Sequence, residues 1–206
     1  MAARRRFRGR IAGVGSTSGV RVVVGWWLES PWGEFADAMV ERADGHRMVL
    51  APSDRVAELV STTYTFDEVR VEPFAVQPGP GEAPRSWVVR SPTLELDLVV
   101  GPRTGLGRLL RLVPGPVAAS PAFATVADPV ARLVLDGVRT RGTARTGRRE
   151  YYGATDVHAV TAMTGALDGV PLGTLAPVDP PCRFGFSSTP RRPSVTDVVT
   201  TIVDLG

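Results

Sequence analysis

Residues 21–50, RVVVGWWLESPWGEFADAMVERADGHRMVL, carry the pattern that decides the fold. Residues 21–28, 34–42 and 46–50 are rich in β-branched and aromatic side chains, which favour strands. Asp44-Gly45 separates the last two runs, and an Asp-Gly pair accepts the positive φ angles of a tight hairpin turn. The stretch therefore predicts a strand followed by a β-hairpin.

The same pattern continues outward over the whole chain. The sequence has 30 valines and 18 threonines, and 22 glycines and 18 prolines punctuate it. Two further Asp-Gly turns are expected, at Asp136-Gly137 and Asp168-Gly169. Many short strands separated by turns are typical of a sandwich or barrel. The other expected strands span residues 7–14, 64–76 with a phase slip at Pro73, 86–90, 94–100, 139–152, 157–167, 183–187 and 195–203.

Short helices are expected between the strands. Ser53 is placed to cap a turn that carries Val56, Leu59 and Val60 on one face. A second helix has leucines at helical spacing from Leu106 and ends at Pro114. Asp128-Pro129 fits either a third turn or the first arm of a hairpin.

We therefore expect a mainly β protein, a single-domain antiparallel β-barrel or curved sandwich of about 9–11 strands with two or three short helices. The domain is expected to span residues 1–206, with residues 1–6 as a flexible basic arm.

Missing residue types exclude several chemistries. The single cysteine rules out a disulfide framework and a thiolate zinc cluster, and the absence of lysine rules out Schiff-base enzymes and the phosphate-binding P-loop. The histidines, His46 and His158, lie far apart in the sequence, so we expect no metal site and no cofactor. No apolar run is long enough to span a membrane or to act as a signal peptide, so we expect a cytoplasmic protein.

Positive charge is concentrated in two places. Five of the first ten residues are arginines, and the remaining 19 arginines face 21 acidic residues. A second basic run covers residues 139–149 and precedes Tyr151 and Tyr152. A basic strand followed by tyrosines is compatible with single-stranded nucleic acid or with an acidic ligand. A solvent-facing strand is the simpler interpretation, so nucleic-acid binding through the basic arm and this run remains the second alternative function.

The tryptophan cluster is the strongest functional signal. Trp26, Trp27, Trp32 and Phe35 place four of the fourteen aromatic residues within ten positions. Neighbouring side chains of a strand point to opposite faces, so Trp26 and Trp27 cannot fill one core. The leading hypothesis is a cavity that binds an apolar or amphipathic small molecule, oriented by arginine. The candidate ligand-binding residues are Trp26, Trp27, Trp32, Phe35, Arg141 and Tyr152.

The first alternative is a metal-free enzyme. Asp156 and His158 are two positions apart, so a regular strand would place them on one face as an acid–base pair. These two residues are the catalytic candidates, and no other catalytic residue is assigned. Besides a hydrophobic small molecule, a second copy of the chain is a possible partner.

Three resemblances accompany these patterns. Gly25-Trp26-Trp27 resembles the Gly-x-Trp of lipocalins, which implies a closed ligand-binding barrel of about eight strands. The stretches GWWLESPWGEFADAMV, YYGATD and PVDPPCRFGFSSTP resemble an uncharacterised family of mostly-β bacterial proteins, which implies no particular activity. The β-rich architecture is also similar to the cone-shaped barrel of acetoacetate decarboxylases, whose catalytic lysine is missing here.

Overall fold

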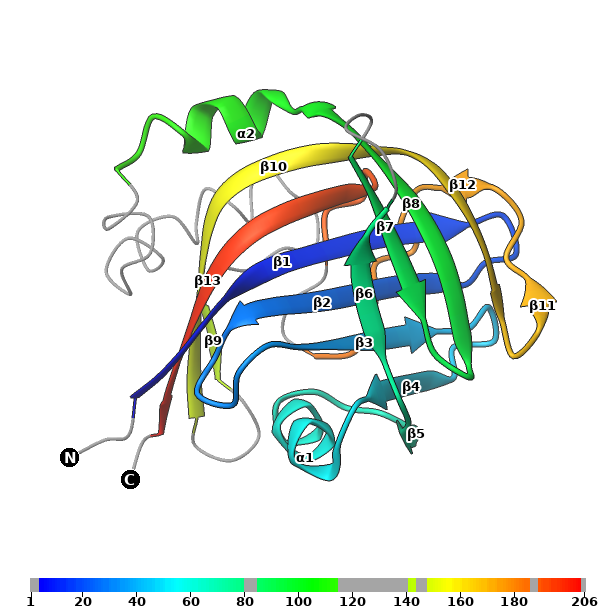
Figure 1. The fold of residues 1–206 in the computed structure, drawn as a ribbon, viewed down its shortest axis with the longest axis horizontal. Helices are drawn as coiled ribbons and strands as arrows, with labels where there is room; N and C mark the ends of the chain where they lie inside the picture. The colour runs from blue at the N-terminus through cyan, green and yellow to red at the C-terminus, as the bar shows by residue number, and fades with distance from the viewer. Residues whose placement is uncertain (1–3, 80–84, 115–140, 144–147, 186–188, 205–206) are drawn as a thin grey trace.

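The chain forms one curled β-sheet in the computed structural model, which describes residues 4–79, 85–114, 141–143, 148–185 and 189–204 (Figure 1). Within these residues the main path of the sheet has ten strands in the order β5-β4-β3-β2-β1-β13-β10-β8-β7-β6, with β9, β11 and β12 paired at its margins. The strands are β1 (Arg4–Ser16), β2 (Arg21–Glu29), β3 (Phe35–Glu41), β4 (Arg47–Ala51), β5 (Glu68–Val71), β6 (Ala75–Pro78), β7 (Arg85–Arg90), β8 (Leu94–Arg103), β9 (Arg141–Thr143), β10 (Arg148–Leu167), β11 (Val170–Pro171), β12 (Leu175–Ala176) and β13 (Ser194–Asp204).

The sheet is mixed but mostly antiparallel, and it curls into a half-barrel. β4 and β5 run parallel, whereas the other neighbours on the path are antiparallel. The predicted mainly β, barrel-like class is therefore confirmed, with a barrel that is half closed.

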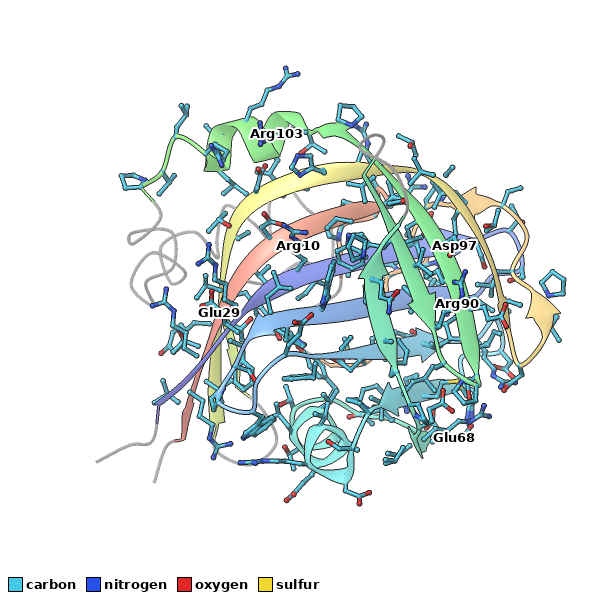
Figure 2. The ribbon with its side chains drawn as sticks, in the orientation of Figure 1. Arg10, Glu29, Glu68, Arg90, Asp97 and Arg103 are labelled. Carbon is cyan, nitrogen blue, oxygen red and sulfur yellow. The ribbon has the colours of Figure 1, made fainter. Side chains whose placement is uncertain are left out.

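The main core fills the inner face of the curl. Alternate residues of β1–β4 meet alternate residues of β6–β8 across the hollow. In β8, Leu94, Leu96 and Leu98 are fully buried, whereas Glu95 is exposed and Asp97 pairs with Arg90 on the outside (Figure 2). Each buried leucine stabilises the fold by roughly 1.5–3 kcal/mol, and the period of two leaves the other face of each strand for a second layer.

Two predicted Asp-Gly turns are confirmed. Asp44-Gly45 joins β3 to β4, with Gly45 at a φ of +90° and a hydrogen bond from the Arg42 N–H to the His46 carbonyl. Asp168 and Gly169 join β10 to β11 and both have positive φ, +50° and +75°, as a type I′ turn requires. Asp136-Gly137 lies outside the described residues.

The single long strand expected over residues 64–76 is wrong. β5 lies at one edge of the sheet beside β4, and β6 lies at the other edge beside β7. Between them Pro73 lacks the N–H that a continuing ladder needs. Phe74 packs into the inner core, and Glu72 accepts hydrogen bonds from Thr93. The phase slip at Pro73 thus marks a crossing between the two edges of the half-barrel.

Two helices occur in the described part of the chain. α1 (Asp54–Thr63) is capped by Ser53, whose side chain accepts from the Val56 N–H as predicted. α2 (Gly105–Leu110) is capped by the side chain of Thr104. Neither helix is long and apolar enough to cross a membrane. The turn or hairpin arm expected at Asp128-Pro129 is outside the described residues.

Other expected boundaries differ from the structure. Residues 4–6, expected in a flexible arm, pair with Thr201–Val203 of β13, since the strand has a partner along this length. The strands expected at 139–152 and 157–167 become β9 and one 20-residue strand, β10, which register shifts bend rather than interrupt. Residues 183–185 form no strand. Instead, Phe184 packs with Val23 and Val178 on the outer face of the sheet.

Candidate functional site

Trp26 and Trp27 lie on opposite faces of β2. Trp26 is 8% exposed and meets Trp87 edge-to-face, with ring centroids 5.3 Å apart. Trp27 lies on the outer face, where its ring is 5.9 Å from that of Phe7 and 6.3 Å from that of Phe35. Each indole lines a different cavity. We call them the inner cavity, in the hollow of the curl, and the outer cavity, between the sheet and α1.

The inner cavity has a volume of about 360 Å³ and a mixed lining. Arg10 of β1, labelled in Figure 2, lines this cavity. Its guanidinium carbon is 5.8 Å from the centre of the Trp26 ring, and its Nε is 3.3 Å from Oδ1 of Asp197. His158 of β10 lines the same cavity. The remaining lining residues are Pro78, Gly79, Ser86, Trp87, Val100 and Val195.

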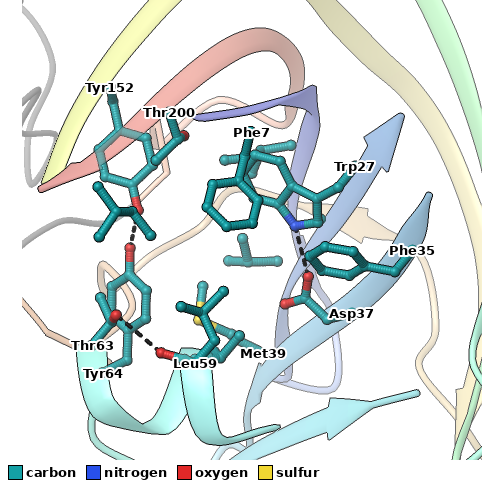
Figure 3. A pocket seen from close by; sticks show the side chains of 15 residues that line it. Phe7, Trp27, Phe35, Asp37, Met39, Leu59, Thr63, Tyr64, Tyr152 and Thr200 are labelled. Atoms are coloured by element: carbon teal, nitrogen blue, oxygen red, sulfur yellow. Dashed lines mark hydrogen bonds between the residues drawn. The ribbon is translucent and has the colours of Figure 1, made fainter. Parts of the chain in front are cut away.

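The outer cavity is smaller, about 70 Å³, and more apolar. β1, β2, β3, β13 and β10 form one side, and α1 with the residue after it forms the other (Figure 3). Five aromatic rings line it: Phe7, Trp27, Phe35, Tyr64 and Tyr152. The other lining residues are Ile11, Val23, Gly25, Asp37, Met39, Leu59, Val60, Thr63, Thr200 and Ile202.

Asp37 brings a carboxylate into this apolar cavity. Its Oδ1 accepts a hydrogen bond of 2.9 Å from Nε1 of Trp27, and the residue is 6% exposed. Burial raises the pKa of Asp37 to about 7, although the Trp27 hydrogen bond acts in the opposite direction. A carboxyl group that exchanges its proton near neutral pH inside a cavity is typical of functional sites.

Gly25 makes room for the Trp27–Asp37 hydrogen bond. A Cβ atom on Gly25 would lie 2.7 Å from Oδ1 of Asp37 and 2.8 Å from Nε1 of Trp27. Any larger residue would therefore push the two groups apart, so the glycine between Val24 and Trp26 is a requirement of the site.

Hydroxyl groups complete the polar part of the outer cavity. The hydroxyls of Tyr64 and Tyr152 are hydrogen-bonded to each other (Figure 3). Thr200 is 3% exposed, and its Oγ1 has no hydrogen-bond partner among the described residues. An unsatisfied buried hydroxyl costs stability unless a ligand or water meets it.

The structure brings together three of the six candidate ligand-binding residues. Trp27, Phe35 and Tyr152 line the outer cavity, whereas Trp26 lines the inner one. Trp32 packs behind the outer cavity, against Phe7, Phe35 and the guanidinium of Arg55 in α1. The side chain of Arg141 lies outside the described part.

The two catalytic candidates are not hydrogen-bonded to each other within the described residues. Asp156 is instead held by Arg103, whose Nε lies 2.8 Å and 2.9 Å from its two carboxylate oxygens, and by the Val157 N–H. Burial raises the pKa of Asp156, but these hydrogen bonds, together with the electrostatic effect of His158 and Arg103, outweigh it and hold the pKa below its ordinary value. His158 lines the inner cavity without this carboxylate, so the acid–base pair stays a prediction.

The arginines of β1 meet acidic partners. Arg8 pairs with Glu29 at 3.6 Å, and Arg10 pairs with Asp197. Part of the charge that suggested a nucleic-acid contact is therefore balanced within the sheet. The side chains of the second basic run, residues 139–149, lie outside the described part.

Several lining residues were missed at the level of the sequence. By sequence Arg10 belongs to the basic N-terminal residues, and Trp87 and Tyr64 belong to expected strands without a functional signal. Asp37 carried a signal that could have found it, because it interrupts the apolar run Ala36–Val40 on the same strand face as Phe35 and Met39. Thr200 carried none, because threonine is common in strands.

Comparisons with known proteins add no relative. No family model, curated protein or solved structure matches the chain. The described residues also contain no cluster of three or more His, Cys, Asp or Glu side chains that could hold a metal ion. The two cavities are therefore the features of the described residues that point to a function.

Proposed function

We propose that the protein binds a small amphipathic molecule in the inner cavity. The observation that carries the proposal is the meeting of two indole rings and a guanidinium group, Trp26, Trp87 and Arg10, in one cavity of about 360 Å³. Small-molecule sites typically measure roughly 300–1,000 Å³ and combine apolar walls with a few placed polar groups.

The walls favour a flat apolar body. Trp26 and Trp87 stand almost perpendicular, at 88°, so a planar ligand that lies along one indole meets the edge of the other. Val100 and Val195 extend the apolar lining. Aliphatic ligands fit the same walls but gain less from the rings.

The polar end favours an acidic head group. The Arg10–Asp197 pair is partly exposed on both sides, at 39%, so it stabilises the fold little. A guanidinium has five N–H donors and Asp197 faces its Nε, so a ligand carboxylate can share the remaining donors. His158 supplies a second polar group in the same cavity.

We expect aromatic carboxylic acids to quench the intrinsic tryptophan fluorescence and to bind more tightly than the corresponding amides. Arg10→Gln should weaken binding of the acids about tenfold, because it removes a charge-assisted hydrogen bond, and should leave the amides unchanged. A titration with fatty acids, isoprenoids, polyketides and aromatic acids, each paired with its neutral amide or ester, measures both effects.

Matched tryptophan variants locate the ligand. Trp87→Leu removes a ring of the inner cavity and should weaken binding, whereas Trp32→Leu changes a ring on the other face of the sheet and should not. A fluorescence signal that ignores the whole panel, or an affinity that Arg10→Gln and Trp87→Leu leave unchanged, would overturn the proposal.

A further inference from the structure

We propose that the outer cavity is a second binding site, which holds a small organic ammonium group between aromatic rings and the carboxylate of Asp37. The site lies on the opposite face of the sheet from the inner cavity, and its residues do not overlap with those of the amphipathic ligand site. Failure of one proposal would therefore leave the other unaffected.

Differently oriented rings form the walls of the site. The Phe7 ring meets Trp27 at 72° and Phe35 at 87°, with centroids 5.9 Å and 6.4 Å apart, while Tyr64 and Tyr152 close the far side (Figure 3). Ring faces carry partial negative charge, and cages of such rings bind alkylated ammonium groups. The rings come from four strands and from the residue after α1, so the cage forms only when these elements pack together.

One carboxylate supplies the counter-charge. Asp37 is the single charged side chain among the residues that line the outer cavity. Its Oδ1 accepts from Trp27, while Oδ2 has no donor in the part of the chain that the structure describes. Thr200 adds a buried hydroxyl that likewise has no partner there. Among the described residues, the cavity is thus lined by oxygen atoms that can accept further hydrogen bonds and by no cationic side chain.

Size and chemistry exclude the other ligand classes. An anion would face a carboxylate and ring faces of the same sign. A metal ion prefers several carboxylate or carbonyl oxygens, whereas this lining offers one carboxylate and otherwise only hydroxyl groups. The outer cavity of about 70 Å³ is too small for a drug-sized ligand, so it suits a single compact head group.

Binding is expected to depend on pH through Asp37. The titratable groups that face it across the cavity are Tyr64, which follows α1, and Tyr152 of β10, whereas β1, β2, β13 and α1 contribute apolar or hydroxyl side chains. Burial raises the pKa of Asp37 to about 7. The ammonium ion prefers the ionised carboxyl, so its affinity should rise about tenfold from pH 6 to pH 8.

The test uses choline as the probe and 3,3-dimethylbutan-1-ol, in which carbon replaces the charged nitrogen, as its neutral control. Calorimetry measures both affinities, and the indole N–H resonance of Trp27 reports on the site by NMR. We expect choline to bind at least tenfold more tightly than the alcohol and to shift that resonance. Asp37→Asn keeps the shape of the cavity and its aromatic rings, so it should reduce the preference for choline and abolish its pH dependence.

Two control variants separate the explanations. Asp97→Asn removes an exposed carboxylate on the outside of β8, and Arg10→Gln alters the inner cavity. Both should leave choline binding unchanged. The proposal would be overturned by equal affinity for choline and the alcohol, or by an undiminished preference for choline in Asp37→Asn. Displacement of choline by potassium chloride at constant ionic strength would overturn it as well. So would the absence of any shift of the Trp27 indole resonance at saturating choline.

Discussion

Asp37→Asn is expected to stabilise the protein at pH 8 by about 3 kcal/mol, measured by urea unfolding. Burial raises the pKa of Asp37 from 3.8 to about 7, and each unit is worth about 1.4 kcal/mol, so the ionised carboxylate costs the fold roughly 4 kcal/mol. The asparagine removes the charge and keeps an acceptor for the Trp27 indole. Its amide N–H groups lie in an apolar cavity, which lowers the expected stabilisation by about 1 kcal/mol.

The effect should depend on pH with a definite sign. Between about pH 4 and 7 the folded state holds a proton on Asp37 that the unfolded chain has lost, so the stability of the native protein falls as the pH rises through this window. The asparagine variant lacks this slope. The two proteins should therefore differ little at pH 5 and most at pH 8.

An exposed aspartate provides the matched control. Asp97 is 48% exposed and pairs with Arg90 on the outside of the sheet, so Asp97→Asn should change stability by less than about 1 kcal/mol at either pH. If Asp37→Asn and the native protein have parallel pH profiles, Asp37 does not carry the buried charge described here. A carboxylate that costs stability and contacts a cavity is the compromise expected of a binding site.

Glu41→Gln is expected to destabilise the protein by about 3–5 kcal/mol. Glu41 is fully buried, and its carboxylate lies 3.1 Å from Nη2 of Arg21, its cross-strand neighbour, which is 6% exposed. It also accepts from the backbone N–H and the Nε of Arg183. Removing the negative charge leaves the Arg21 guanidinium buried with only neutral acceptors, namely the glutamine amide oxygen and the carbonyls of Arg42 and Pro180.

Chemical denaturation at pH 7 measures this loss, with Glu29→Gln as the control. Glu29 is 71% exposed and lies 3.6 Å from Arg8, so its change should cost less than about 1 kcal/mol. Replacing the pair together, as Arg21→Met with Glu41→Leu, should recover much of the stability, because no uncompensated charge remains buried. A Glu41→Gln loss as small as that of Glu29→Gln would show that the buried pair is dispensable.

Glu41 also connects the core to the outer cavity. The segment that carries Arg183 continues into Phe184, which packs with Val23 and beside Tyr64 on the outer face. The buried ion pair therefore anchors the layer that covers the outer face of the sheet next to the cavity, so loosening it should disturb the position of Tyr64.

Local patterns predicted much of the β architecture. The hairpin around Asp44-Gly45, the Asp168-Gly169 turn and the Ser53 cap follow from backbone preferences that act within a few residues. The separation of Trp26 from Trp27 follows from the period of a strand. Pairings between distant segments were beyond such reasoning, which is why β5 and β6 were merged into one strand although they lie at opposite edges.

The candidate site was predictable only in part. Strand alternation places Phe35 and Asp37 on one face, and the sequence alone determines that much, because side-chain direction in a strand is a local property. Trp27 joins this face through the register of β2 with β3. Which residues from β10, β13 and α1 complete the cavity depends on the curl of the sheet and on the packing of α1. The burial of Asp37, and with it the raised pKa, was therefore decided by the tertiary structure alone, because desolvation depends on neighbours far away in the chain.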